Sequence, residues 1–158
     1  MALQHCSRRI EEKDSYMASS VVTVIKEQHR EVDKLVQQVE AMKGDVAGAL
    51  QKIQDMLKPH HEAEEDFVYP TIEKVDPDTE EEIRDGTAEH DQIMGLLDDL
   101  LNQEPGGPGF DGTVAAFAAE LRHHFQEEED DLLPELQESM SRPDLEAMGE
   151  RFIKATTG

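Results

Sequence analysis

The chain has 158 residues, with 37 Asp and Glu against 15 Lys and Arg, and its formal net charge is −22. This length suits one domain with a single core, and the negative charge disfavours binding to nucleic-acid phosphates or to an anionic membrane surface. The single cysteine, Cys6, excludes an internal disulfide and a cysteine-based zinc cluster and fits a reducing cytoplasm, while the absence of a long apolar run predicts no membrane span and no cleavable signal.

The first half of the chain predicts a polar extension followed by two helices. Residues 1–17 are polar and aperiodic, and we interpret them as a flexible extension. Apolar residues then recur at helical spacing over residues 21–42 and again over residues 46–75. Pro59 lies within the second stretch and lacks a backbone donor, which predicts either a kink or two helices in line.

The second half predicts two more long helices and a short one. A helical stripe over residues 80–101 is followed by a Pro- and Gly-rich connection at residues 105–109 and then by a fourth stripe. Strand-like alternation is absent from the sequence. We therefore predict an all-α fold in which residues 18–140 form an antiparallel up-down-up-down four-helix bundle, with a short helix and tail at residues 141–158.

Polar residues at the predicted helix starts indicate how each helix is capped. Ser20 precedes the first helix and Asp45 precedes the second. Thr79 and Glu82 form a capping-box pattern at the start of the third helix, and Asp111 is placed to cap the fourth.

The chain contains an internal repeat that duplicates its histidines. Residues 57–70 match residues 121–134 without a gap, and residues 28–36 resemble residues 89–97. Each copy is a helix hairpin that carries one lone histidine and one His-x-x-x-Glu pair. The matched pairs are His29 with His90, His60 with His124, and Glu64 with Glu128.

Helical phase predicts that these side chains face the core. At about 100° per residue, both His-x-x-x-Glu pairs and both lone histidines lie on the apolar stripes of their helices. In antiparallel helices, residues at equal distance from a tight turn lie at the same level, so the histidines share one layer. The residues predicted to converge are His29, His60, Glu64, His90, His124 and Glu128.

Several neighbouring residues are predicted to lie outside this layer. His123 and Glu127 face solvent by the same phase, and His61 lies at the edge of the apolar stripe. We interpret the rest of the acidic runs at residues 62–66 and 127–131 as solvated surface.

The converging set points to a metal centre. A single buried histidine is usually a hydrogen-bonded core residue, but four imidazoles and two carboxylates in one layer are costly to bury without a cation. Imidazole and carboxylate without thiolate suit iron or manganese, and zinc less distinctively. The two-fold arrangement is what a two-metal centre requires, and the ferritin-like pattern, with a Glu-x-x-His motif on each of two helices and further glutamates from the others, is absent.

These motifs resemble those of the hemerythrin-like, or HHE cation-binding, domains. The resemblance covers about residues 21–140 and is carried by Gln28-His29, Glu89-His90 and the two H-x-x-x-E-(E/D)-x-x-x-x-P blocks that begin at His60 and His124. It implies two iron ions in a non-haem centre bridged by an oxo or hydroxo group. In such a centre, Glu64 and Glu128 would bridge the irons and the four histidines would be terminal ligands.

The chain departs from the oxygen-carrying hemerythrins. Its third helix has one histidine instead of two, and Glu128 follows His124 by four residues, where the carriers have a carboxylate five residues after a histidine. The pattern looks more like the bacterial, actinobacterial-type proteins, for which peroxide decomposition is the implied activity. It also resembles iron-sensing variants, in which an additional ligand would be His61 or Tyr69.

The sequence thus supports two hypotheses of function. The first is a cytoplasmic di-iron protein that reacts with hydrogen peroxide or dioxygen, with catalase-like decomposition favoured. The second is a non-enzymatic protein that binds, senses or stores iron, oxygen or nitric oxide. Both predict small-molecule partners and neither fixes the oligomeric state.

Overall fold

Residues 19–157 are described by the computed structural model, and every regular element among them is helical. The predicted extension at residues 1–17, with Cys6, lies outside the described residues. Two short π-helical segments and one 3-10 turn connect α-helices end to end. The elements are α2 (Val21–Glu40), α3 (Val46–Ala63), η1 (Glu64–Val68), α4 (Tyr69–Val75), η2 (Pro77–Thr79), α5 (Glu80–Leu101), α6 (Phe110–Glu127), η3 (Glu128–Leu132), α7 (Leu133–Ser139) and α8 (Arg142–Thr157).

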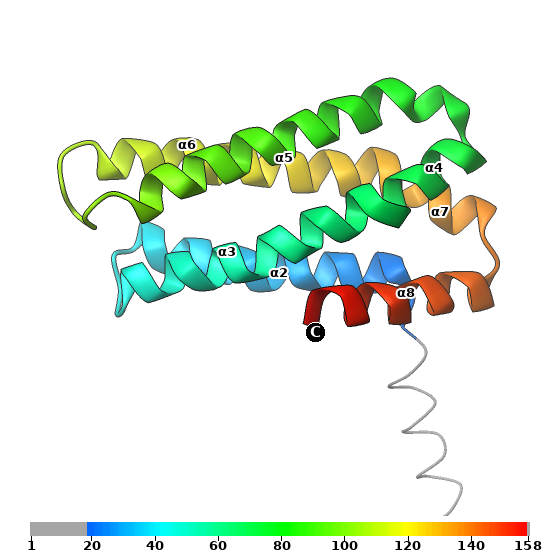
Figure 1. Cartoon of the computed structure of the whole chain (residues 1–158), viewed down its shortest axis with the longest axis horizontal. Helices are drawn as coiled ribbons and strands as arrows, with labels where there is room; N and C mark the ends of the chain where they lie inside the picture. Colours follow the sequence, from blue (N-terminus) through cyan, green and yellow to red (C-terminus); the bar gives the residue numbers. More distant parts are fainter. Residues whose placement is uncertain (1–18, 158) are drawn as a thin grey trace, which may run out of the picture.

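Four antiparallel rods make up the bundle. They are α2, the continuous run from α3 through η1 to α4, then α5, and the run from α6 through η3 to α7 (Figure 1). The fifth helix, α8, packs along α2 and α3 (Figure 1). The predicted all-α up-down-up-down bundle with an added C-terminal helix is therefore confirmed. No helix within residues 19–157 is both long and apolar enough to cross a bilayer.

Two of the predicted caps are confirmed. The Ser20 hydroxyl accepts a hydrogen bond from the Val22 amide at 3.2 Å, and the Asp45 carboxylate accepts one from the Gly48 amide at 2.9 Å. Each satisfies one of the amides that the first turn of a helix leaves unpaired.

The other two predicted caps are wrong. The Thr79 hydroxyl donates to the Asp76 carbonyl at 2.6 Å and caps no amide of α5. Asp111 lies inside α6, which begins one residue earlier, after Gly109. Gly109 has a φ of 81°, a left-handed conformation that favours glycine, so the backbone enters the helix at Phe110 before Asp111 can act as a cap.

In the second and fourth rods, the regular α-helix is interrupted by a short π-helical segment. Helix α3 continues through Pro59, and the change comes at Glu64. In the π segment the Tyr69 amide bonds to the Glu64 carbonyl five residues back, just before Pro70, whose ring would crowd a regular α-helical turn. In an α-helix Tyr69 would face about 140° away from Glu64, and the extra residue in the π turn returns it to the same side.

The core has two apolar clusters with a polar layer between them. Each cluster draws residues from both hairpins, and the intervening buried side chains are the histidines and glutamates predicted from the repeat. One cluster includes Ile53, Leu97 and Phe117, and the other includes Ile25, Ile72, Leu136 and Phe152. The fold thus places these six ionisable side chains in a buried layer between the two apolar clusters.

Candidate metal centre

All six predicted convergent residues lie in this layer, and each long rod supplies at least one of them. Their exposed fractions range from 0% to 3%. They are His29 on α2, His60 on α3, Glu64 on η1, His90 on α5, His124 on α6 and Glu128 on η3. His123 and Glu127, predicted to face solvent, are 59% and 49% exposed, which confirms the helical phase.

The first cluster of possible ligands joins the two hairpins. His29, His60, Glu64 and Glu128 each offer one ligand atom, and these atoms lie within 4.8 Å of one another. His29 Nε2 is 3.4 Å from Glu128 Oε1, and His60 Nε2 is 2.5 Å from Glu64 Oε1. Glu128 therefore reaches the histidines of the opposite hairpin.

A second cluster shares both carboxylates with the first. Glu64 and Glu128 also lie within 4.8 Å of the ring nitrogens of His90 and His124. His124 Nε2 is 3.5 Å from Glu128 Oε2 and 3.0 Å from His90 Nε2. The two carboxylates therefore belong to both clusters and join them into one layer.

Each of the four histidines has a hydrogen-bond partner at its outer nitrogen, Nδ1. With Nδ1–H donating outward, Nε2 keeps its lone pair facing the interior, which is the tautomer that binds a metal. The pairs follow the repeat: His29 with Glu129 at 2.9 Å, His90 with Glu65 at 2.7 Å, His60 with Gln28 at 2.8 Å, and His124 with Glu89 at 3.4 Å.

The interpretation of Glu65 and Glu129 as purely solvated surface is wrong. They are 40% and 33% exposed, yet each carboxylate accepts from a buried histidine on a neighbouring rod. Each follows a buried glutamate, so its side chain leaves the rod at the edge of the interface and reaches across. Their match in the repeat was the one signal in the sequence that pointed to a shared role.

Helix α8 fixes the orientation of Gln28. The Thr156 hydroxyl donates to the Phe152 carbonyl at 2.8 Å, so it accepts from Gln28 Nε2 at 2.9 Å. The amide oxygen of Gln28 is thereby left to accept from His60 Nδ1. A hydrogen-bonded series thus runs from α8 to a residue of the first cluster.

The two clusters differ in the aromatic rings beside them. Phe125 stacks on His29 with ring centroids 3.8 Å apart, and at the matched position His61 stacks on His90 with centroids also 3.8 Å apart. His61 is only 4% exposed, although helical phase placed it at the edge of the stripe. With His90 and His124 it forms a third group of ligand atoms within 4.8 Å.

Tyr69 lies on the same side as His61. Its hydroxyl donates to Glu128 Oε2 at 2.6 Å and is 3.2 Å from His90 Nε2. The matched residue in the other hairpin is Leu133, which is fully buried and offers no polar atom. The cluster around His90 and His124 therefore has an imidazole and a phenol that the other cluster lacks.

The two buried carboxylates have pKa shifts in opposite directions. Burial and the charge of Glu128 raise the pKa of Glu64 well above its usual range. Burial alone would raise the pKa of Glu128 too, but its interactions with Glu64 and His29 outweigh burial and lower that pKa well below its usual range. The surroundings thus favour a proton on Glu64 over one on Glu128.

Burial keeps most of the imidazoles neutral. It lowers the pKa of His60 and of His61 well below 6.5, and it lowers that of His90 to about 3, with neighbouring imidazoles adding to the effect. For His29, burial is outweighed by Glu128 and Glu129, and its pKa is raised. Neutral imidazole is the form that binds a metal.

The layer leaves polar atoms without partners, and this is where a cation fits. An unpaired buried polar atom costs about 1–3 kcal/mol, so several in one layer are destabilising unless a ligand satisfies them. Their nitrogen and oxygen donors, with no thiolate, suit iron, manganese or zinc. The atoms are Nε2 of His29 and of His60, both ring nitrogens of His61, both oxygens of Glu64, and Oε1 of Glu128.

Comparison with known proteins points to the same chemistry. The searches of curated proteins and of solved structures found no match. The family model described as the hemerythrin HHE cation binding domain matches residues 20–136, a range that contains every residue of both clusters. The chain therefore belongs to the hemerythrin HHE cation-binding domain family, and its buried histidine and glutamate clusters fit a metal-binding domain.

Proposed function

We propose that this protein is a non-haem di-iron protein that reacts with hydrogen peroxide or dioxygen, and that catalase-like decomposition of peroxide is its favoured activity. The observation that carries the proposal is the pair of ligand clusters that share Glu64 and Glu128. His29 and His60 would hold one iron, and His90 and His124 would hold the other. The two carboxylates would lie between them.

The irons, when bound, would supply Lewis acidity and electron transfer to a small oxygen-containing substrate. The protein would contribute orientation, apolar packing of the histidines and a hydrogen-bond donor. Phe125 stacks on His29, and the ring of Phe152 lies 5.3 Å from that of His60. On the opposite side, the Tyr69 hydroxyl donates to Glu128 Oε2 at 2.6 Å.

Peroxide turnover is favoured over reversible oxygen carriage because fewer histidines than in the oxygen carriers would leave both irons more open to exogenous ligands. Here α5 supplies only one of the six ligands, His90, and Glu128 follows His124 by four residues. His61 and Tyr69 are proposed as additional ligands of the iron held by His90 and His124. His61 forms a group of ligand atoms with those two histidines, and the Tyr69 hydroxyl is 3.2 Å from His90 Nε2.

A second function is favoured by the third group of ligand atoms. If His61 binds, three imidazoles would surround one iron and two the other. Such an unequal pair suits binding of dioxygen or nitric oxide at the less saturated iron, without turnover, as in a sensor or a store.

The test is to load the purified chain with iron, count the irons by elemental analysis, and measure the oxygen evolved from hydrogen peroxide. We expect about two irons per chain and catalytic oxygen evolution. Clean reversible oxygenation of the reduced protein without peroxide turnover would favour the second function. A single tightly held zinc, with no uptake of iron, would contradict both.

A further inference from the structure

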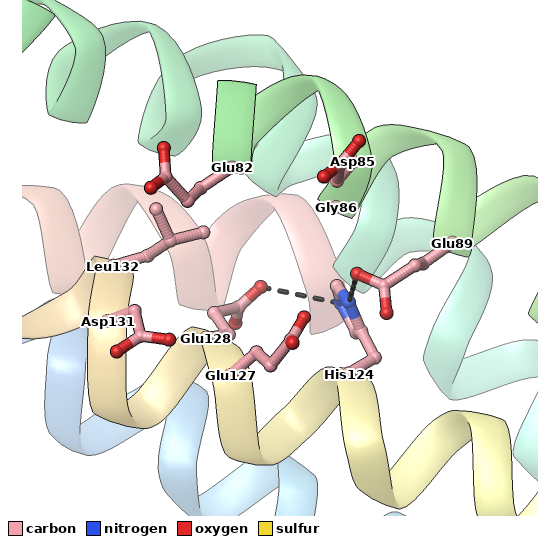
Figure 2. Close-up of a pocket in the computed structure, with 9 residues that line it drawn as sticks. All are labelled: Glu82, Asp85, Gly86, Glu89, His124, Glu127, Glu128, Asp131 and Leu132. Atoms are coloured by element: carbon pink, nitrogen blue, oxygen red, sulfur yellow. Dashed lines mark hydrogen bonds and ion pairs between the residues drawn. The ribbon is translucent and has the colours of Figure 1, made fainter. Parts of the chain in front are cut away.

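A pocket of about 100 Å³ lies beside His124 and Glu128, between α5 and the α6–η3 rod (Figure 2). Its outer wall carries the carboxylates of Glu82, Asp85 and Asp131. Glu89 and Glu127 also line it, and none of its described lining residues is Lys or Arg. All the charged residues that line this pocket are therefore acidic, and a cation that enters it meets carboxylates before it meets His124 and Glu128.

On α5, two of the three acidic positions of this pocket are the matched copies of apolar positions on α2. The repeat that pairs His29 with His90 also pairs Val21 with Glu82 and Val24 with Asp85. Val21 and Val24 are 0% and 5% exposed, and both belong to the apolar cluster that contains Phe152. The same face is thus dry on one hairpin and charged on the other.

The α6–η3 rod shows the same difference. Ala63 and Phe67 are buried, whereas their matched residues, Glu127 and Asp131, are carboxylates in the pocket wall. On the dry side Phe152 of α8 fills the equivalent space, with its ring 5.3 Å from His60 and 6.1 Å from Phe67. Helix α8 therefore closes the approach beside His60, while the matched approach beside His124 stays open.

Gly86 keeps the inner part of the open side clear. Its matched residue, Ile25, is fully buried. A Cβ at Gly86 would lie 3.3 Å from the Tyr69 hydroxyl, so a larger side chain would fill the space next to Tyr69. The absence of a side chain here leaves room between the outer carboxylates and the buried layer.

Glu128 stands at the inner end of the pocket. It is 1% exposed, it lines the same space as Glu127 and His124, and its Oε1 has no hydrogen-bond partner (Figure 2). Glu89 lies beside His124 in the same pocket, and its Oε1 is 3.4 Å from His124 Nδ1 (Figure 2). Oxygen donors therefore continue from the surface to an unsatisfied buried carboxylate.

We propose that this acidic pocket is the route by which a divalent metal cation reaches the buried clusters. The inference rests on the proposed function, because it concerns delivery to the same centre. A concave surface with one sign of charge raises the local concentration of ions of opposite sign and repels like-charged ones. Carboxylate oxygens are also suitable transient ligands for a hydrated divalent cation.

The test compares two triple variants of the full-length, metal-free chain that change the net charge equally. The pocket variant is Glu82→Gln/Asp85→Asn/Asp131→Asn. The control is Asp99→Asn/Glu104→Gln/Asp111→Asn, at exposed positions near the α5–α6 turn. Each protein is mixed with Fe²⁺ under anaerobic conditions, the reaction is stopped with a chelator at increasing times, and protein-bound iron is measured.

We expect the pocket variant to load about tenfold more slowly than wild type, with the same final iron content, and the control to load at close to the wild-type rate. Raising the ionic strength should slow the wild type more than the pocket variant. Equal rates for wild type and pocket variant, or equal slowing of both variants, would overturn the proposed route while leaving the di-iron proposal intact. Failure of wild type to take up any iron would overturn both.

Discussion

The two hairpins of the bundle carry the same ligand types but place them in different surroundings. Around His29 and His60 the neighbouring rings are those of Phe125 and Phe152, and α8 packs along α2 and α3. Around His90 and His124 the matched neighbours include a third imidazole and a phenol, and the outside is an acidic pocket. Duplication is therefore sufficient to place two clusters of possible metal ligands in one layer, while the residues beside each cluster give the two halves different surroundings.

The largest expected effect is the loss of iron from the cluster around His90 and His124, which α8 does not cover and which we call the uncovered half. His124→Ala removes a buried ring from one cluster and should lose most of the bound iron, since Glu128 is shared by both halves. His123→Ala is the matched control, because its ring is 59% exposed and lies outside the layer. Elemental analysis of the two purified variants decides this, and equal loss in both would mean that His124 is not a ligand.

Removing the metal should lower the free energy of unfolding of the whole bundle, because both clusters would lose their ligand. A ligand that binds only the native state stabilises it by about 4 kcal/mol at a thousandfold excess over its Kd. The metal-free chain should therefore unfold at a clearly lower denaturant concentration than the iron-loaded chain. Identical denaturation midpoints would show that the histidines do not act jointly as ligands.

On the covered half, Phe152→Ala should destabilise the metal-free protein by about 3 kcal/mol, because a fully buried phenylalanine is replaced by a cavity. The neighbouring Ile153→Ala is the control, since Ile153 is 40% exposed and should change the free energy of unfolding by about 0.5 kcal/mol or less. Urea denaturation measures both, and a similar small loss in each would mean that α8 does not seal this half.

Acid should affect the metal-free protein through its neutral imidazoles. The lowered pKa values of His60, His61 and His90 mean that the unfolded chain takes up protons below pH 6.5 that the folded chain does not, so stability falls as the pH falls. The raised pKa of His29 has the opposite effect on stability, but it acts above pH 6.5. The raised pKa of Glu64 also opposes the loss of stability in acid, by at most the binding of one proton.

The substitution His61→Phe introduces the residue found at the matched position, Phe125, and removes one of these imidazoles. It should lessen the loss of stability between pH 6.5 and 5.5 by up to about 1.4 kcal/mol, the value of one proton per pH unit. Urea denaturation at the two pH values measures this. An unchanged pH dependence would show that His61 is not held neutral in the folded state.

The smallest effect concerns the link between α8 and His60. Thr156→Val removes the hydroxyl that orients Gln28 and should cost about 1 kcal/mol. It should also shift the ring-nitrogen resonances of His60 in the metal-free protein, because its Nδ1–H loses a fixed acceptor. Thr156→Ser should restore both, and Thr157→Val, whose hydroxyl contacts only α8 itself, should leave the resonances in place. Unchanged resonances in Thr156→Val would remove α8 from the control of this histidine.

The sequence by itself determined the bundle and six members of its polar layer, the four histidines of the repeat and the two glutamates that follow them. Apolar residues at a period of 3.6 define which face of each helix is buried, and the repeat places His29 with His90 and His60 with His124 at the same distance from their turns. Both relations are local to one helix or one hairpin. They therefore do not depend on how the rods rotate against one another.

Only the tertiary structure determined the contacts that side chains make between one rod and the next. Glu65 and Glu129 reach their histidines because adjacent rods present those positions to each other, and His61 is buried because the ring of His90 stacks on it. Tyr69 returns to the layer through the wide π turn before Pro70. Periodicity within one helix carries no information about the phase of its neighbour, nor about where a π turn shifts that phase, and these determine the surroundings of each half of the centre.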